Sequence, residues 1–285
     1  MPSQFSIAIF FIIAAEFTFS SMAVVVKMAA THLPNESIVF FRNFFVMIFL
    51  LPWILPQCKQ KLATDILHLH ILRSLSGLSS MYCYYYAIAH IPLSEATLLK
   101  QTAPFFIPLI TFFWFGEQIF MMTAWAILLG FIGVLIILRP EVNLSSIAWI
   151  GVLGSLFAAL SKSSIRRMSA TEPSIRIVFY FTSIGTAISV IPMTWAWVTP
   201  NYETWILMFL LGVFGTIAQL CMTKGFKLAP TSQLAVFTYA SIIFATIYGW
   251  IFWQEWIDYR FFIGTLLIFI AGVLITSTNK RYAKT

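Results

Sequence analysis

Long hydrophobic runs separated by short polar breaks make up most of this chain. Runs of about 20 residues are long enough to cross a bilayer, because a helix of that length spans ~30 Å. Polar pairs that contain proline, such as Pro34-Asn35 and Ile91-Pro92, mark several of the breaks. The pattern predicts an all-α integral membrane protein with ten transmembrane helices, at residues 5–27, 38–56, 71–90, 93–115, 122–138, 147–166, 175–197, 204–224, 231–253 and 260–278.

The fourth predicted span, residues 93–115, carries polar side chains within an apolar helix. At ~100° per residue, Thr97, Lys100 and Gln101 fall on one side of it. A charge near the middle of the bilayer costs at least ~2.5–3.5 kcal/mol unless another group compensates it. This side of the helix is therefore expected to face protein or water, so we predict that the span lines a cavity.

Composition supports a membrane protein and excludes several other classes. The chain has 285 residues, of which 60% are hydrophobic and 9% charged, whereas a soluble domain carries about 25% charged residues. Ten spans leave only short loops and no room for a separate soluble domain. The net charge of +7 lies in the loops, which argues against nucleic-acid binding. Three scattered cysteines predict neither a disulfide framework nor a metal site.

The distribution of lysine and arginine predicts the orientation, since cytoplasmic loops are enriched in both. With a cytoplasmic N-terminus, four basic residues lie on the outer side, namely Lys27, Arg42, Arg139 and Arg260. Twelve lie on the inner side, namely Lys59, Lys61, Arg73, Lys162, Arg166, Arg167, Arg176, Lys224, Lys227, Lys280, Arg281 and Lys284. We therefore expect both termini in the cytoplasm of a bacterial cell whose inner membrane holds the protein.

The chain also repeats itself at an offset of 138 residues, at which glycines, prolines and glutamates coincide. The matching pairs are Gly77 and Gly215, Pro92 and Pro230, Ser94 and Ser232, and Glu117 and Glu255. Abundant leucine and isoleucine could match by chance, but these residues make chance a poor explanation. Each half holds an odd number of spans, so the second must be inserted upside down. We predict two inverted five-helix repeats, at residues 1–140 and 145–279, an arrangement typical of transporters.

The first span carries Glu16, Ser20 and Lys27 on one helical face, and Lys162 lies on the equivalent face of the sixth span. A carboxylate at the position of Glu16 must be paired, protonated or hydrated. It is either a cation site or proton carrier, or a fixed ion pair with Lys100 or Lys27. Lys100 itself could neutralise Glu16, bind an anionic substrate group or reach the membrane surface.

Other polar and aromatic residues complete a candidate binding site. Serines and glycines of the third span favour tight helix packing, whereas aromatic faces can hold a cation or a flat ring. The predicted substrate-binding residues are Glu16, Ser20, Ser80, Tyr84, Thr97, Lys100, Gln101, Lys162, Gln219, Thr238 and Tyr239. The sequence has no HExxH, Walker A, GxGxxG or GxSxG motif. We therefore expect no enzyme activity and no cofactor or metal.

Several motifs resemble the EamA-type drug/metabolite transporter family. They are Phe41-Arg42-Asn43-Phe44, the run AIAHIPLSEA at residues 87–96, and the glutamates Glu117 and Glu255 that follow the fourth and ninth spans. Residues 70–108 are also similar, more weakly, to S-adenosylmethionine uptake permeases. The family resemblance implies a central cavity lined by helices 1, 3, 4, 6, 8 and 9 that opens alternately to each side.

These observations together predict a secondary transporter. We expect it to move a small polar or amphiphilic metabolite by alternating access, either coupled to protons or as an exchanger. One alternative is a permease of the S-adenosylmethionine type, and another is a non-transporting membrane scaffold or receptor. The expected partners are a small-molecule metabolite and the lipid bilayer, while the oligomeric state and the direction of transport stay open.

Overall fold

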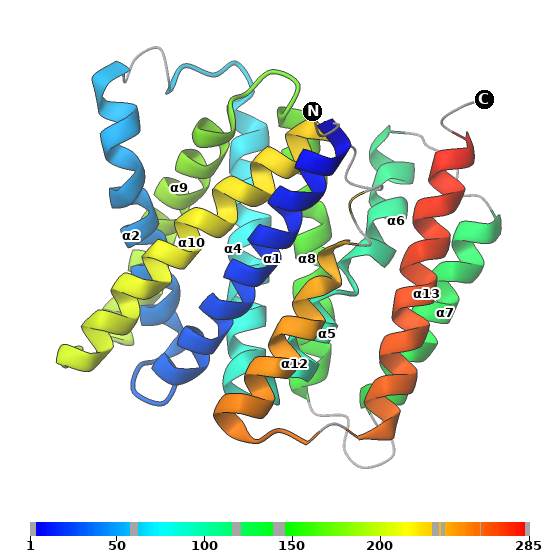
Figure 1. The fold of residues 1–285 in the computed structure, drawn as a ribbon. Helices are drawn as coiled ribbons and strands as arrows, with labels where there is room; N and C mark the ends of the chain where they lie inside the picture. The colour runs from blue at the N-terminus through cyan, green and yellow to red at the C-terminus, as the bar shows by residue number, and fades with distance from the viewer. Residues whose placement is uncertain are drawn as a thin grey trace.

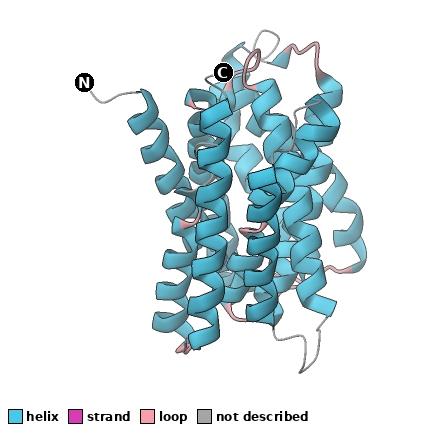
Figure 2. Cartoon of the chain, turned by 90° about the vertical axis from the view of Figure 1, so that its right-hand side faces the viewer, coloured by secondary structure: helices cyan, strands magenta, loops and turns pink. Residues whose placement is uncertain are grey.

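The computed structural model describes residues 4–57, 62–115, 121–138, 146–229, 234, 237–256 and 258–282. All regular elements in these ranges are helical (Figures 1 and 2). The short 3-10 helix η1 (Leu55–Gln57) follows the second helix. The α-helices are α1 (Gln4–Ala29), α2 (Asn35–Ile54), α4 (Leu67–His90), α5 (Leu93–Lys100), α6 (Ala103–Phe115), α7 (Met121–Leu138), α8 (Ser146–Met168), α9 (Ser174–Trp195), α10 (Tyr202–Leu228), α12 (Ala240–Trp253) and α13 (Tyr259–Tyr282).

The helices follow the predicted spans when α5 and α6 are taken as one crossing. Within the described residues, five segments are long and apolar enough to span a membrane by length and composition: α1, α2, residues Leu93–Trp114, α9 and α10. The start of α1 and the end of α13 lie at the same end of the bundle (Figure 1). This agrees with an even number of crossings. Which end faces the cytoplasm stays a prediction.

The expectation of one continuous helix over residues 93–115 is wrong. The chain turns at Gln101 and Thr102, where α5 ends and before α6 begins. A turn bond replaces the helical one at Thr102, whose backbone N–H donates to the Leu99 carbonyl at 3.1 Å. Pro104 follows directly and has no N–H to donate to the carbonyl four residues earlier. A break within a crossing is tolerated where neighbouring protein satisfies the freed backbone groups.

The second half breaks at the equivalent place. A turn at Tyr239, which is 138 residues after Gln101, precedes α12. The two breaks contact each other, because the Gln101 side-chain amide donates to the Thr238 carbonyl at 2.8 Å. The Thr238 hydroxyl donates in return to the Gln101 side-chain oxygen at 3.2 Å. The two halves are therefore hydrogen-bonded to each other at the points where their helices are interrupted.

Helix packing follows the duplication. The first and eighth crossings, α1 and α10, pack along each other, and so do their counterparts, α8 and α4. Contacts of α2 with α10 are likewise matched by contacts of α9 with α4. The fifth and tenth crossings, α7 and α13, pair at one side of the bundle (Figure 1). The contacts are those expected of two related halves that face each other.

Polar and apolar side chains are distributed as in a protein surrounded by lipid. Large apolar side chains such as Phe10, Trp125 and Phe262 are more than half exposed. In contrast, Glu16 and Arg42 are buried in the interior. Buried ionisable groups need partners or water, and Glu16 and Arg42 both line one cavity.

Candidate functional site

A cavity of about 90 Å³ lies between the two halves. Its walls come from α1, α2, α4 and α5 of the first half and from α8, α9 and α10 of the second half. It is lined by Glu16, Phe19, Met22, Arg42, Arg73, Gly77, Ser80, Met81, Tyr84, Tyr85, Lys100, Ala158, Ser161, Lys162, Phe181, Gln219 and Met222. Sites for small molecules usually enclose roughly 300–1,000 Å³, so this conformation is too narrow for most metabolites.

Glu16 of α1 lies in this cavity with Lys100 of α5 and Lys162 of α8. The Lys100 ammonium lies 4.7 Å from the ring centroids of both Phe19 and Tyr84, so two aromatic faces hold it. The Glu16 carboxylate interacts electrostatically with both lysines, but no ion pair within 4.0 Å joins it to Lys100 in the described part of the chain. Glu16, Lys100 and Lys162 therefore share the cavity, and Glu16 and Lys100 are not in direct contact.

Two arginines line another part of the same cavity, around the ring of Phe181 on α9. The guanidinium carbon of Arg73 lies 4.1 Å from the ring centroid, and that of Arg42 lies 5.5 Å from it. Their hydrogen bonds go to neutral amide oxygens. Arg42 Nη1 donates to Asn43 Oδ1 at 2.9 Å, and Arg73 Nη2 donates to Gln219 Oε1 at 3.2 Å.

Sequence reasoning missed both arginines because it counted them as loop residues on opposite sides of the membrane. Arg42 is fully buried and Arg73 is 3% exposed, and Lys162, which was also counted, lines the cavity. Without these three, ten basic residues lie on the predicted inner side and three on the outer side, so the predicted orientation is unchanged. The available signal was position, since both arginines fall inside predicted spans.

One glycine in each half leaves room for an arginine. A side chain at Gly77 would meet Arg73 Nη1 and Phe181, and one at Gly215 would lie 3.0 Å from Arg42 Nε. The two glycines are the pair that the repeat aligns at an offset of 138. The sequence suggested only tight helix packing for them, but each one also borders a guanidinium.

The predicted binding residues divide into two groups. Six line the cavity: Glu16, Ser80, Tyr84, Lys100, Lys162 and Gln219. The other five are not part of its lining: Ser20, Thr97, Gln101 and Thr238 bond to neighbouring helices, and Tyr239 lines a separate apolar pocket beside α12 and α13. Thr97 meets the Tyr84 hydroxyl at 3.1 Å, and the Ser20 hydroxyl donates to the Ser241 carbonyl at 3.3 Å. Apart from Tyr239, this second group holds the broken helices against their neighbours.

At one end of the bundle, an ion pair joins three separate segments. Lys27 at the end of α1 lies 2.5 Å from Glu255, which follows α12. Both Glu255 oxygens accept from the backbone N–H of Leu93 at 3.0 Å, where α5 begins. Lys27 also lies 4.9 Å from the ring centroid of Trp253. Lys27 therefore pairs with Glu255, which removes it as the fixed partner of Glu16.

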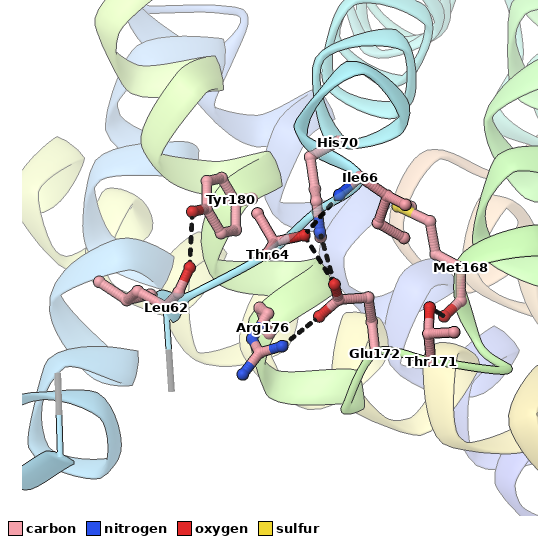
Figure 3. A network of polar contacts seen from close by, with 9 residues as sticks. All are labelled: Leu62, Thr64, Ile66, His70, Met168, Thr171, Glu172, Arg176 and Tyr180. Carbon is pink, nitrogen blue, oxygen red and sulfur yellow. Dashed lines mark hydrogen bonds and ion pairs between the residues drawn. The ribbon is translucent and has the colours of Figure 1, made fainter. Parts of the chain in front are cut away.

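At the opposite end, Glu172 links the α8–α9 connection to the first half (Figure 3). Thr64 Oγ1 and Arg176 Nη1 each donate to this carboxylate at 2.6 Å. His70 Nε2 lies 3.8 Å from it, and the His70 ring stacks on Tyr180. Burial opposes ionisation, but the hydrogen bonds from Thr64 and Arg176 outweigh it and lower the pKa of Glu172 below its usual 4.5. The carboxylate is therefore ionised at neutral pH.

The EamA-like transporter family matches residues 6–139 and 145–277. The chain belongs to this family. It is 34% identical over 274 residues to the pseudopaline exporter CntI of Pseudomonas aeruginosa (strain UCBPP-PA14), with 94% of this chain and 95% of the relative covered. As a member of a transporter family, it is a membrane transporter of small metabolites and not an enzyme.

More distant relatives of this EamA transporter carry other substrates. It is 25% identical over 278 residues to an S-adenosylmethionine uptake transporter of Rickettsia bellii, covering 97% of this chain and 96% of the relative. It is 24% identical over 258 residues to a riboflavin transporter of Vibrio cholerae, covering 88% and 86%. A solved crystal structure has the same fold, with a TM-score of 0.72, 17% identity, and 97% of this chain and 99% of that one covered.

Proposed function

We propose that this EamA transporter moves a small polar metabolite by alternating access through the cavity between its halves. The observation that carries the proposal is the cavity itself, where ionisable side chains from both halves meet inside the membrane. At about 90 Å³ it must widen to admit a substrate. Separation of the halves at one end at a time would widen it.

The two end networks supply contacts that such a motion would break in turn. Lys27 and Glu255 join α1, α5 and the end of α12 at one end. Thr64, Glu172 and Arg176 join the two halves at the other end. Opening either end costs its charge-assisted hydrogen bonds, which contribute about 1.5–3 kcal/mol each. Substrate bound in the cavity would offset this cost.

The charges in the cavity disfavour S-adenosylmethionine as the substrate. That compound carries a sulfonium cation, whereas Arg42, Arg73, Lys100 and Lys162 outnumber the single carboxylate of Glu16. Its uptake by the Rickettsia bellii relative therefore does not transfer to this chain on chemical grounds. The relatives include an exporter and uptake transporters, so direction must be measured.

Counterflow into proteoliposomes tests the proposal. Vesicles that hold the full chain are loaded with unlabelled metabolites in turn, and entry of the labelled compound is followed. Saturable counterflow of at least one compound is expected. Cysteines at 27 and 255, in a chain whose native cysteines are replaced by serine, can be joined by a bifunctional methanethiosulfonate reagent long enough to replace both side chains; this cross-link should stop the flux, and reduction should restore it. Absence of flux from every compound would favour the scaffold or receptor alternative.

Proton coupling through Glu16 is a separate part of the proposal. A carboxylate that lies among cations and releases its proton when substrate leaves would link the two fluxes. We expect Glu16→Gln to abolish accumulation driven by a pH gradient while exchange continues. The same measurement on Glu203→Gln, an exposed glutamate of α10, is the control. Gradient-driven accumulation that survives in Glu16→Gln would refute the coupling role.

A further inference from the structure

No carboxylate of the described residues forms an ion pair with either arginine of the cavity. Arg42 is fully buried and Arg73 is 3% exposed. Arg42 Nε and Nη2 and Arg73 Nε and Nη1 have no hydrogen-bond acceptor within the described residues. The polar groups that the two guanidiniums do reach are neutral: the amides of Asn43 and Gln219, and the Tyr85 hydroxyl beside Arg42. Four buried donor nitrogens therefore have no acceptor in this conformation, on two residues that line one cavity.

Glu16 does not neutralise this pair. Its electrostatic partners are Lys100 and Lys162. The cavity lining holds four cationic side chains and one carboxylate, a formal excess of three positive charges. Arginine stays protonated in proteins, and a buried charge without a counter-charge is costly. The Phe181 ring between the two guanidiniums compensates only part of that cost.

Resting on the proposed function, we infer that Arg42 and Arg73 form an anion subsite and that the substrate is a small compound with two or more carboxylates. A planar guanidinium presents paired N–H donors that match a carboxylate. One carboxylate would lie against the free nitrogens of Arg42 and Arg73. A second would lie toward Lys100 and Lys162, where Glu16 is the one carboxylate among the described lining residues.

Binding measurements on the purified full chain test this inference directly. The probes are glutarate and propane-1,2,3-tricarboxylate, with glutaramide as the uncharged counterpart, at constant ionic strength. We expect the carboxylates to raise the melting temperature and glutaramide to leave it unchanged. Equal responses to glutarate and glutaramide, or no response to either carboxylate, would overturn the inference.

Variants separate binding by the arginines from a structural role. Arg42→Gln and Arg73→Gln should weaken tricarboxylate binding at least 10-fold. Arg42→Lys and Arg73→Lys keep the positive charge but lose the paired N–H donors of the guanidinium, so they should bind with intermediate affinity. Arg166→Gln, on the exposed end of α8, should match the parent. The melting temperature of the ligand-free variants reports the loss of the hydrogen bonds to Asn43 and Gln219, whereas the tricarboxylate affinity reports binding. A lower melting temperature together with unchanged tricarboxylate affinity would overturn the inference.

Counterflow distinguishes this inference from the proposed function. If neutral or cationic compounds exchange through the parent protein and its Arg42→Gln variant at equal rates, while no carboxylate competes, transport stands and the anion subsite fails. If no compound exchanges at all, the transport proposal fails as well. Competition by tricarboxylate that is lost in Arg42→Gln supports both.

Discussion

The contact between Lys27 and Glu255 gives a direct test of the proposed closure of one end of the cavity. The Glu255 carboxylate accepts from Lys27 at 2.5 Å and from the Leu93 N–H at 3.0 Å, and both charged side chains are less than a fifth exposed. Glu255→Gln keeps an oxygen for Leu93 and a similar shape. It removes the charge that holds Lys27 and attracts the end of α1 to α12.

The expected size of this change follows from the contact. A hydrogen bond to a charged group contributes about 1.5–3 kcal/mol, and each 1.4 kcal/mol is a tenfold change in an equilibrium. If the contact is lost on opening, Glu255→Gln should raise the population open at the Glu255 end by roughly 10- to 150-fold. A ligand with no preference between the two states would not reverse this shift.

Cysteine labelling from each face of the membrane measures the shift. Ser80 is half-buried in the cavity lining, so Ser80→Cys in a chain without other cysteines reports access to the cavity. In Glu255→Gln, labelling by an impermeant maleimide should rise from the face that carries residue 255 and fall from the opposite face. The exposed Glu203→Gln change should alter neither rate. Equal labelling of Glu255→Gln and its parent from both faces would show that this contact does not close the cavity.

Two further changes probe the opposite end and the centre. Because the pKa of Glu172 is lowered on folding, its contribution to closure is complete at neutral pH and is lost as pH falls below 4.5. Glu172→Gln at pH 7 should therefore raise Ser80→Cys labelling from the face that carries residue 172, and no rise there would contradict the role of Glu172. Gln101→Leu removes the link to the Thr238 carbonyl and should cost about 1–3 kcal/mol, seen as a lower melting temperature. Thr31→Ala, at an exposed site, is its control, and an unchanged melting temperature in Gln101→Leu would refute the link.

The crossings were predictable because hydrophobic runs of membrane length are a strong local signal. The break at Gln101 was missed for a related reason. The polar residues keep a helical spacing across the break. Because transmembrane helices tolerate proline, Pro104 within a long apolar run was not taken as the sign of a turn. The observation that Pro104 lacks the donor for a helical bond at Lys100 would have located the interruption.

The arginine pair was missed because basic residues near span ends were counted as loop residues. That rule concerns the number of charges on each side and not what a particular side chain contacts. Arg42 and Arg73 meet at Phe181 only because α2, α4 and α9 pack together. That contact joins residues 42, 73 and 181 across both halves, so no single stretch of sequence contains it.

The two broken crossings explain how a cavity this charged can exist inside the bundle. At Gln101 and Thr238 each half interrupts its helix, and the Gln101 side-chain amide and the Ser241 hydroxyl both donate to the Thr238 carbonyl, while the Thr238 hydroxyl donates to the Gln101 side-chain oxygen. The interruption places the end of α5, and with it Lys100, beside Glu16 and Lys162. The hydrogen bonds at the breaks are made between the halves, so they fix the centre of the molecule while contacts at either end can part. A motion that pivots at Gln101 and Thr238 would open one end and close the other without exposing the central backbone groups to lipid.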